Sequence, residues 1–219
     1  MRSRFDEQLS QLNADLIDMG TMIEYAIESC AGALMHMDGA LAAKIVEFDH
    51  DVDRKERDIE SLCLKLILHQ QPIARDLRFI SAALKMITDM ERIGDQAADI
   101  SEIVTMMLRD EPPRITGHFP DMAQATIGMV HSAVDAFVRR DLALARQVIA
   151  DDDVVDRLFD DVRGDLIALL AASPDRGRQA LDLLMIAKYF ERIGDHATNI
   201  AEWVEYTLTG VHRSEELEG

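Results

Sequence analysis

Apolar residues recur along this chain at alternating steps of four and three, the spacing of a helix that buries one stripe. The first such stripe consists of Phe5, Leu9, Leu12, Leu16, Met19, Ile23, Ala26, Cys30 and Leu34. It ends at residues 37–39, where Asp38 can cap the next helix and Gly39 tolerates a turn. The pattern therefore predicts a long first helix that packs at a shallow angle against its neighbours.

The same spacing predicts two more helices in the first half. One carries apolar positions over residues 41–66 and ends at residues 69–72, where Pro72 removes a backbone donor. The apolar stripe of the next consists of Ile73, Leu77, Ile80, Leu84 and Ile87. It ends before residues 109–114, a segment with two prolines that we expect to separate the halves.

The second half repeats the plan, with apolar stripes from Met122 to Ala136, from Leu144 to Ile167 and, for the last helix, from about Gln179. No stretch alternates with a period of two for long enough to predict a strand. The expected fold class is all-α, as two tandem, pseudo-symmetric three-helix bundles with six helices. The expected division is residues 1–110 and 117–209 for the bundles, 111–116 for the linker and 210–219 for a polar tail.

Residue identities support this duplication. Residues 89–100 align with residues 189–200 with seven identities in twelve, including Glu-Arg-Ile-Gly-Asp in both. Residues 49–54 align with residues 152–157, at an offset of 103 rather than 100. A repeat of this length indicates a duplicated domain rather than a short solenoid unit.

Each half also contains two pairs of carboxylates spaced by four residues: Asp49/Asp53, Glu91/Asp95, Asp152/Asp156 and Glu191/Asp195. On a helix, side chains at i and i+4 lie above one another, so two anions there repel. Glu91 continues the apolar stripe of its helix, and Gly94 leaves room for a neighbouring backbone or an ion. Several carboxylates without matching cations are typical of a hard-cation site for Mg²⁺, Ca²⁺, Mn²⁺ or iron, and less typically for zinc.

Two other interpretations stay open. The acidic faces can belong to a purely structural helical scaffold, with Arg92 and Arg192 neutralising the carboxylates. The cluster can also serve a metal-assisted phosphohydrolase, although the sequence offers no general base or Gly-rich phosphate loop beside it. A ferritin-like di-iron site requires Glu-x-x-His, and the residue three after Glu91 and Glu191 is glycine, which argues against a redox di-iron oxidase.

The composition and charge of the chain limit the kinds of molecule that it can bind. The 219 residues carry a formal net charge of −18, which disfavours nucleic acid and anionic membrane surfaces. Cys30 and Cys63 are too few for a disulfide framework or a thiolate metal site and favour a reducing compartment. No run reaches the roughly 18 apolar residues that span a bilayer, and the first residues do not resemble a signal peptide. We therefore expect a cytoplasmic protein.

The doubled Glu-Arg-Ile-Gly-Asp motif, the Asp-x-x-x-Asp pairs and the segment Gln-Pro-Ile-Ala-Arg-Asp-Leu-Arg at residues 71–78 together resemble the PhoU family. These proteins are accessory regulators of high-affinity phosphate uptake in bacteria and archaea. The resemblance extends from about Phe5 to Leu208 and implies two pseudo-symmetric three-helix bundles.

The resemblance also implies multinuclear iron or zinc clusters held by the paired motifs. The ligands carried over to this chain are Asp49, Asp53, Glu91, Asp95 and Asp99 in the first half, and Asp152, Asp156, Glu191 and Asp195 in the second. Asn199 stands where the first half has Asp99, so the second site is expected to hold fewer ions or to bind them less tightly. The second half also lacks a counterpart of Asp76-Leu77-Arg78.

The role that the resemblance implies is signalling without catalysis. Its expected partners are the ATPase of a phosphate ABC transporter and a sensor histidine kinase, with the chain keeping the phosphate-starvation response off. It would reach the inner membrane only through these proteins, most simply as a homodimer, and would not bind nucleic acid.

Overall fold

The computed structural model describes residues 2–70, 72–109, 113, 115 and 117–211, and within these the all-α prediction is confirmed. The first bundle consists of α1 (Arg2–His36), α2 (Gly39–Gln70) and α3 (Ala74–Met107). The second consists of α4 (Phe119–Arg139), α5 (Leu142–Ala172) and α6 (Gly177–Thr209), with a short 3-10 turn, η1 (Pro174–Arg176), before α6. The predicted linker (111–116) and polar tail (210–219) lie largely outside the described residues.

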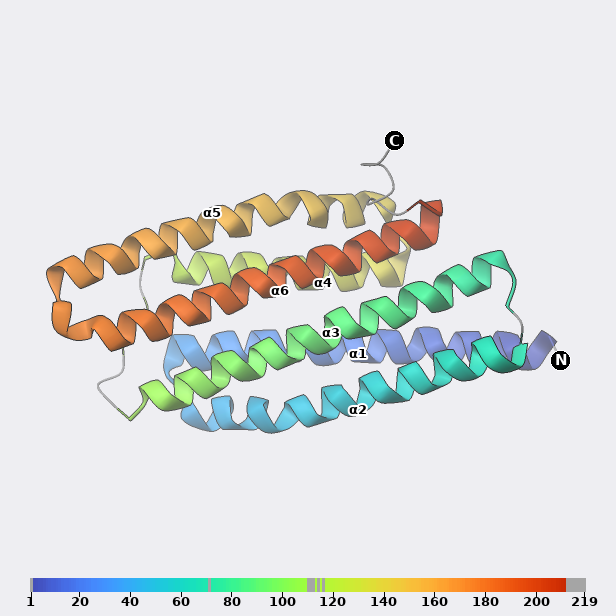
Figure 1. The fold of residues 1–219 in the computed structure, drawn as a ribbon, viewed down its shortest axis with the longest axis horizontal. Coiled ribbons are helices and arrows are strands. Elements are labelled where there is room, and N and C mark those ends of the chain that lie inside the picture. Colours follow the sequence, from blue (N-terminus) through green and yellow to red (C-terminus); the bar gives the residue numbers. More distant parts are fainter. Residues whose placement is uncertain (1, 71, 110–112, 114, 116, 212–219) are drawn as a thin grey trace.

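The two bundles lie against each other with their helices roughly along the long axis of the molecule (Figure 1). α3 packs against α6 and α1 packs against α4, so these four helices join the bundles. α3 and α6 run in opposite directions (Figure 1). The buried apolar side chains of both halves form one continuous cluster, which includes the predicted α1 stripe from Leu12 to Leu34.

The turn between α1 and α2 is a Schellman closure. The N–H of Asp38 donates to the carbonyl oxygen five residues earlier at 2.9 Å, and Met37 adopts a left-handed backbone with φ 51°. Asp38 then accepts a hydrogen bond from the N–H of Leu41 at 3.0 Å, which confirms the predicted cap. The left-handed residue is Met37 rather than Gly39, because this closure requires the positive φ at the residue directly after the end of α1. Gly39 already belongs to α2.

The turn between α4 and α5 repeats this construction. Arg140 has φ 52°, and the N–H of Asp141 donates to the carbonyl oxygen five residues earlier at 2.9 Å. The carboxylate of Asp141 caps α5 by accepting from the N–H of Leu144 at 3.0 Å. Both turns stand at the offset of 103 that relates residues 49–54 to 152–157, so the duplication extends to backbone geometry.

Three residues of the predicted apolar stripes are exposed instead of buried. Ile73 and Leu77 at the start of α3 are 73% and 41% exposed, and Ile167 near the end of α5 is 62% exposed. Ile73 and Leu77 lie at the tip of the first bundle, and periodicity identifies the apolar side of a helix but not where a neighbour covers it. In α5 the buried residue is the adjacent Leu166, so the stripe there was assigned one residue too far along the helix. None of the described helices is long and apolar enough to cross a membrane.

Candidate metal centre

Three carboxylates meet where α2 packs against α3. One oxygen from each of Asp49, Asp53 and Asp95 lies within 4.8 Å of the others. The four-residue spacing places Asp49 and Asp53 on one face of α2, and Asp95 approaches them from α3. In the described part of the chain, no other group of three such ligand atoms comes this close together. This acidic triad could hold a metal ion.

Asp49 contributes an oxygen that is buried without a hydrogen-bond partner, namely Oδ1. Gly94 of α3 leaves the room for it. A Cβ at this position would lie 3.3 Å from Asp49 Oδ1 and 3.0 Å from Val52 Cγ1. A buried carboxylate oxygen that accepts no hydrogen bond costs free energy, so this donor set fits a cation.

Burial, and then the charges of neighbouring carboxylates, raise the pKa of Asp49, Glu91 and Asp95. Burial, followed by the charges of Asp95 and Asp53, raises the pKa of Asp49 to about 6. Burial is also the main cause of the raised pKa values of Glu91 and Asp95, and for Glu91 the Asp95 charge adds to it. Arg92 opposes both shifts.

Two arginines balance part of this charge from the rim. Arg92 Nη1 lies 3.0 Å from Asp95 Oδ2, and Arg57 Nη2 lies 3.2 Å from Asp53 Oδ2. Both arginine side chains are more than half exposed. The expected pairing with Arg92 therefore occurs, but it leaves the buried oxygen of Asp49 without a partner.

Asp99 lies one turn beyond Asp95 and also faces the second bundle. Its charge contributes to the raised pKa values of Asp49 and Asp95. Burial and the Asp99 carboxylate together raise the pKa of Tyr189 on α6. The Asp99 carboxylate is therefore near the triad on one side and near Tyr189, in the contact between α3 and α6, on the other.

The second carboxylate cluster also has partners, but they are a lysine and a threonine rather than two arginines. Thr198 Oγ1 donates to Asp152 Oδ1 at 3.2 Å, and Lys188 forms an ion pair with Glu191. Burial raises the pKa of Asp152 and of Asp195. Near Gly194 the packing is looser than near Gly94, since a Cβ would lie 3.4 Å from the nearest side-chain atom.

A polar contact across the two bundles was not predicted from the sequence. Asp89 Oδ1 on α3 accepts from Asn199 Nδ2 at 3.0 Å and lies 2.9 Å from His196 Nδ1 on α6. In the repeat, Asp89 aligns with Tyr189 and Asn199 aligns with Asp99. The contact of Asp89 with Asn199 and that of Tyr189 with Asp99 therefore join the same two repeat positions across antiparallel helices. The differing residues at these two positions of the repeat were the sequence signal for them.

The two halves of the chain each match a known protein family. The PhoU domain pattern matches residues 16–104 and 119–204. The chain is 34% identical over 210 residues to the phosphate-specific transport system accessory protein PhoU homolog of Clostridium acetobutylicum, covering 95% of this chain and 96% of that protein. It is 35% identical over 215 residues to the homolog of the same name from Zymomonas mobilis, covering 98% and 91%.

Two solved structures have the same fold. PhoU from Pseudomonas aeruginosa superposes with a TM-score of 0.90 at 32% identity, covering 94% of this chain and all of the other. The phosphate transport system regulatory protein PhoU from Streptococcus pneumoniae gives a TM-score of 0.85 at 24% identity, covering 95% and 98%. At that identity the second likeness is evidence for the fold alone.

Proposed function

The chain belongs to the PhoU family, and on that premise we propose that it is a metal-binding, non-enzymatic regulator of phosphate uptake and of the phosphate-starvation response. Relatives named as accessory proteins of the phosphate-specific transport system match it over nearly its whole length. The observation that carries the metal-binding part is the Asp49–Asp53–Asp95 triad, with its unpartnered buried oxygen.

The residues that would hold metal in the first bundle are Asp49, Asp53, Glu91 and Asp95, with Asp99 at the edge. Those in the second bundle are Asp152, Asp156, Glu191 and Asp195. Iron and zinc are the proposed ions, with magnesium, manganese and calcium as alternatives, since all accept carboxylate oxygens. A bound cation would offset the repulsion among these carboxylates and so link metal occupancy to the stability of the helix pairs.

Metal analysis of protein purified without chelator tests this proposal. We expect bound transition metal in the wild-type protein and less of it in Asp95→Asn, which keeps the shape of the side chain but removes its charge. Asp51→Asn is the matched control, because Asp51 lies on α2 between the two ligands but is half exposed and pairs with Arg54. Metal-free wild-type protein, or equal metal content in Asp95→Asn and Asp51→Asn, would contradict the metal centre.

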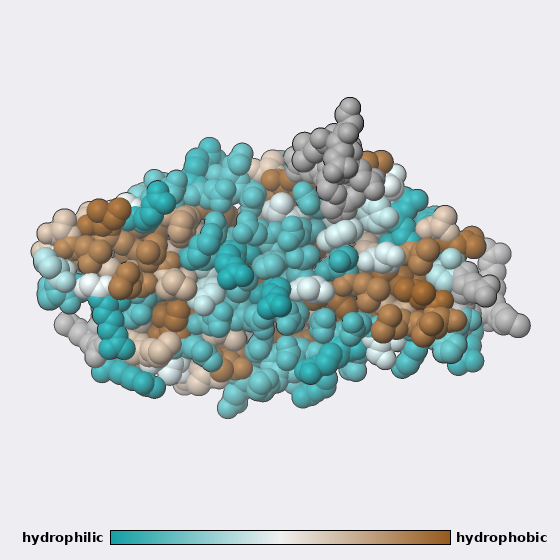
Figure 2. Space-filling view, viewed as in Figure 1, coloured by the Kyte–Doolittle hydropathy of each residue, from teal (hydrophilic) through white to brown (hydrophobic). Residues whose placement is uncertain are grey.

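The proposed partners are the ATPase of a phosphate ABC transporter and a sensor histidine kinase, bound by a homodimer in the cytoplasm. Exposed apolar side chains near the bundle tips support docking of other proteins. They are Leu64, Leu68, Ile73 and Leu77 at the α2–α3 end, and Ile167, Leu181 and Met185 at the α5–α6 end. Figure 2 shows hydrophobic surface toward both ends of this face, with a hydrophilic band between them.

Deletion of the gene tests the regulatory role. If the protein keeps the starvation response off, alkaline phosphatase activity should rise in the deletion strain in phosphate-rich medium. The wild-type gene should restore repression, and Asp95→Asn would report whether the metal centre is needed for it. Activity that stays repressed in the deletion strain would refute the role as a negative regulator.

A further inference from the structure

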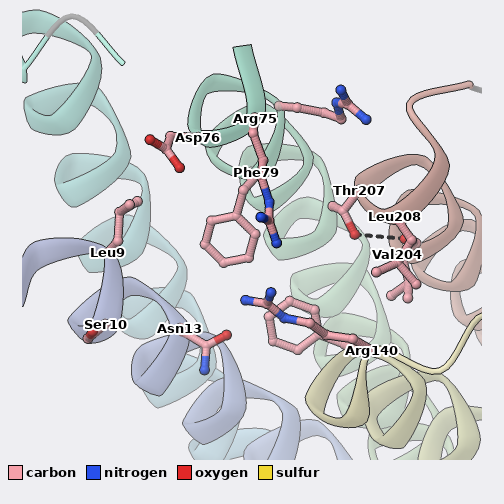
Figure 3. A pocket seen from close by; sticks show the side chains of 12 residues that line it. Leu9, Ser10, Asn13, Arg75, Asp76, Phe79, Arg140, Val204, Thr207 and Leu208 are labelled. Atoms are coloured by element: carbon pink, nitrogen blue, oxygen red, sulfur yellow. Dashed lines mark hydrogen bonds between the residues drawn. The ribbon is translucent and has the colours of Figure 1, made fainter. Parts of the chain in front are cut away.

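A second polar site lies at one end of the contact between the bundles. A cavity of about 650 Å³ opens where the first turns of α1 and α3 meet the last turns of α4 and α6 (Figure 3). Its size is within the range of sites for small molecules. The cavity lies about 25 Å along α3 from Asp95, given 17 residues from Arg78 at 1.5 Å each.

The charge of this cavity is opposite to that of the chain. Arg75, Arg78 and Arg140 line it together with one acidic residue, Asp76, although the whole chain carries −18. The ion pairs found among the described residues include none of these three arginines. Figure 3 shows the Asp76 carboxylate well apart from the guanidinium group of Arg140.

Arg78 has a structural position within the cavity. Gly210, the C-cap of α6, has φ 87°, and a Cβ there would collide with the guanidinium group of Arg78. Arg78 of α3 therefore contacts the C-terminal end of α6, where its positive charge is favourable to the helix dipole. Arg75 and Arg140 are the two arginines left for a ligand.

The internal repeat shows that this basic cavity is not a by-product of the fold. By the offset of 103 that relates the two turns, the counterpart of Arg140 is Met37. By the offset of 100 that relates α3 to α6, the counterpart of Phe79 is Gln179, and position 175 holds an aspartate where the first half has Arg75. Arg78 alone of the three arginines has a basic counterpart, Arg178, so the repeat does not reproduce the set of three arginines.

We propose that this cavity binds a small anion that carries phosphoryl groups. Guanidinium groups present paired donors that match phosphoryl oxygens. Ser10, Asn13 and Thr207 add neutral polar groups to the lining, and Phe79 and Phe137, stacked 6.3 Å apart, provide an apolar wall. Free phosphate, an inorganic oligophosphate and a nucleotide share this chemistry. The proposal rests on the cavity and not on the metal centre.

Isothermal titration calorimetry of the full chain tests it, with inorganic phosphate, tripolyphosphate and ATP as separate probes. Excess EDTA keeps the carboxylate clusters free of metal, so that they cannot bridge to an anion. We expect at least one probe to bind, and Arg75→Gln and Arg140→Gln each to weaken its binding about tenfold or more. The probe that binds most tightly identifies the source of the phosphoryl group.

Arg139→Gln is the matched control, because Arg139 is next to Arg140 but does not line the cavity and pairs with Asp135 at 2.8 Å. It should bind as the wild-type protein does. Arg75 is exposed on the first turn of α3, so its substitution is not expected to impair folding. The proposal is overturned if no probe binds, if both cavity variants bind as well as the wild-type protein, or if Arg139→Gln weakens binding equally. None of these results would bear on the metal content of the protein.

Discussion

Asp49→Asn should stabilise the metal-free protein while it removes the stabilisation that metal provides. In the absence of a cation, the Asp49 carboxylate is partly buried beside two other carboxylates, and one of its oxygens has no hydrogen-bond partner. An asparagine of the same shape carries no charge, and its amide can donate to Asp53 or Asp95. The same change removes a proposed metal ligand, so the two effects have opposite signs.

The raised pKa of Asp49 sets the size of the effect. It lies at about 6 instead of 3.8, mainly because of burial and then because of Asp95 and Asp53. At about 1.4 kcal/mol per pKa unit, the ionised carboxylate costs at most about 3 kcal/mol at neutral pH. Solvent screens part of this cost because Asp49 is only partly buried, so we expect a gain of about 1–2 kcal/mol.

The pH dependence has a definite sign. Between 3.8 and about 6 the folded protein binds more protons at Asp49 than the unfolded chain does. Stability of the metal-free wild-type protein therefore falls as the pH rises through this window. Asp49→Asn lacks this contribution, so its advantage over the wild-type protein should be small below the window and complete above it.

Thermal unfolding of both proteins in EDTA, and again with added Zn²⁺, measures these effects. A gain of 1 kcal/mol corresponds to about 2–4 °C in Tm for a chain of this size. We expect Asp49→Asn to melt above the wild-type protein in EDTA and to gain less from Zn²⁺. A lower Tm than wild type in EDTA, or the same rise in the Asp51→Asn control, would refute the reasoning.

Four further substitutions test glycine packing, the contact between the bundles and a helix cap by urea unfolding in EDTA. Gly94→Ala should cost about 1–2 kcal/mol, because its Cβ would lie 3.0 Å from Val52 Cγ1. Gly194→Ala, with its nearest contact at 3.4 Å, should be neutral or stabilising by up to about 1 kcal/mol, and equal effects at both glycines would contradict this. Asp89→Ala should cost about 2 kcal/mol, because it removes the acceptor of the contact between the bundles, and an unchanged free energy of unfolding would make that contact unimportant. Asp141→Ala should cost about 1 kcal/mol by removing the N-cap of α5, which a loss close to zero would disprove.

Features that depend on nearby residues were predictable from the sequence. Helix limits follow from caps and prolines, and the capping role of Asp38 was correct because it depends only on the residues that follow it. The meeting of Asp49 and Asp53 with Asp95 follows from two helical spacings and one packing contact. These are short-range constraints, and each needs at most one neighbouring helix.

Features that depend on the relative placement of several helices were not predictable. Ile73 and Leu77 continue the apolar stripe of α3 but extend past the helices that would cover them. The arginine cavity needs the ends of four helices to meet, and its residues are spread from Leu9 to Leu208. Its only sequence signal was the segment at residues 71–78, which supplies Arg75 and Arg78 but gives no sign of Arg140.

The two carboxylate clusters show how a duplicated scaffold can acquire two different sites. In the second half, Lys188 and Thr198 bind Glu191 and Asp152. Their counterparts in the first half are Thr88, whose hydroxyl donates to its own helix backbone at 3.3 Å, and Ala98, which has no side-chain donor.

A cation that enters either cluster must displace partners, which lowers the net gain from binding: arginine ion pairs in the first cluster, and an ion pair and a hydrogen bond in the second. Among the described residues, only the first cluster brings three carboxylate oxygens within 4.8 Å of one another, which is the arrangement that a cation requires. Asp99 adds negative charge near the first cluster only, since the second has Asn199 at that position. The first cluster is thus the tighter of the two proposed sites, and as metal becomes available the bundles should fill in order, first α2–α3 and then α5–α6.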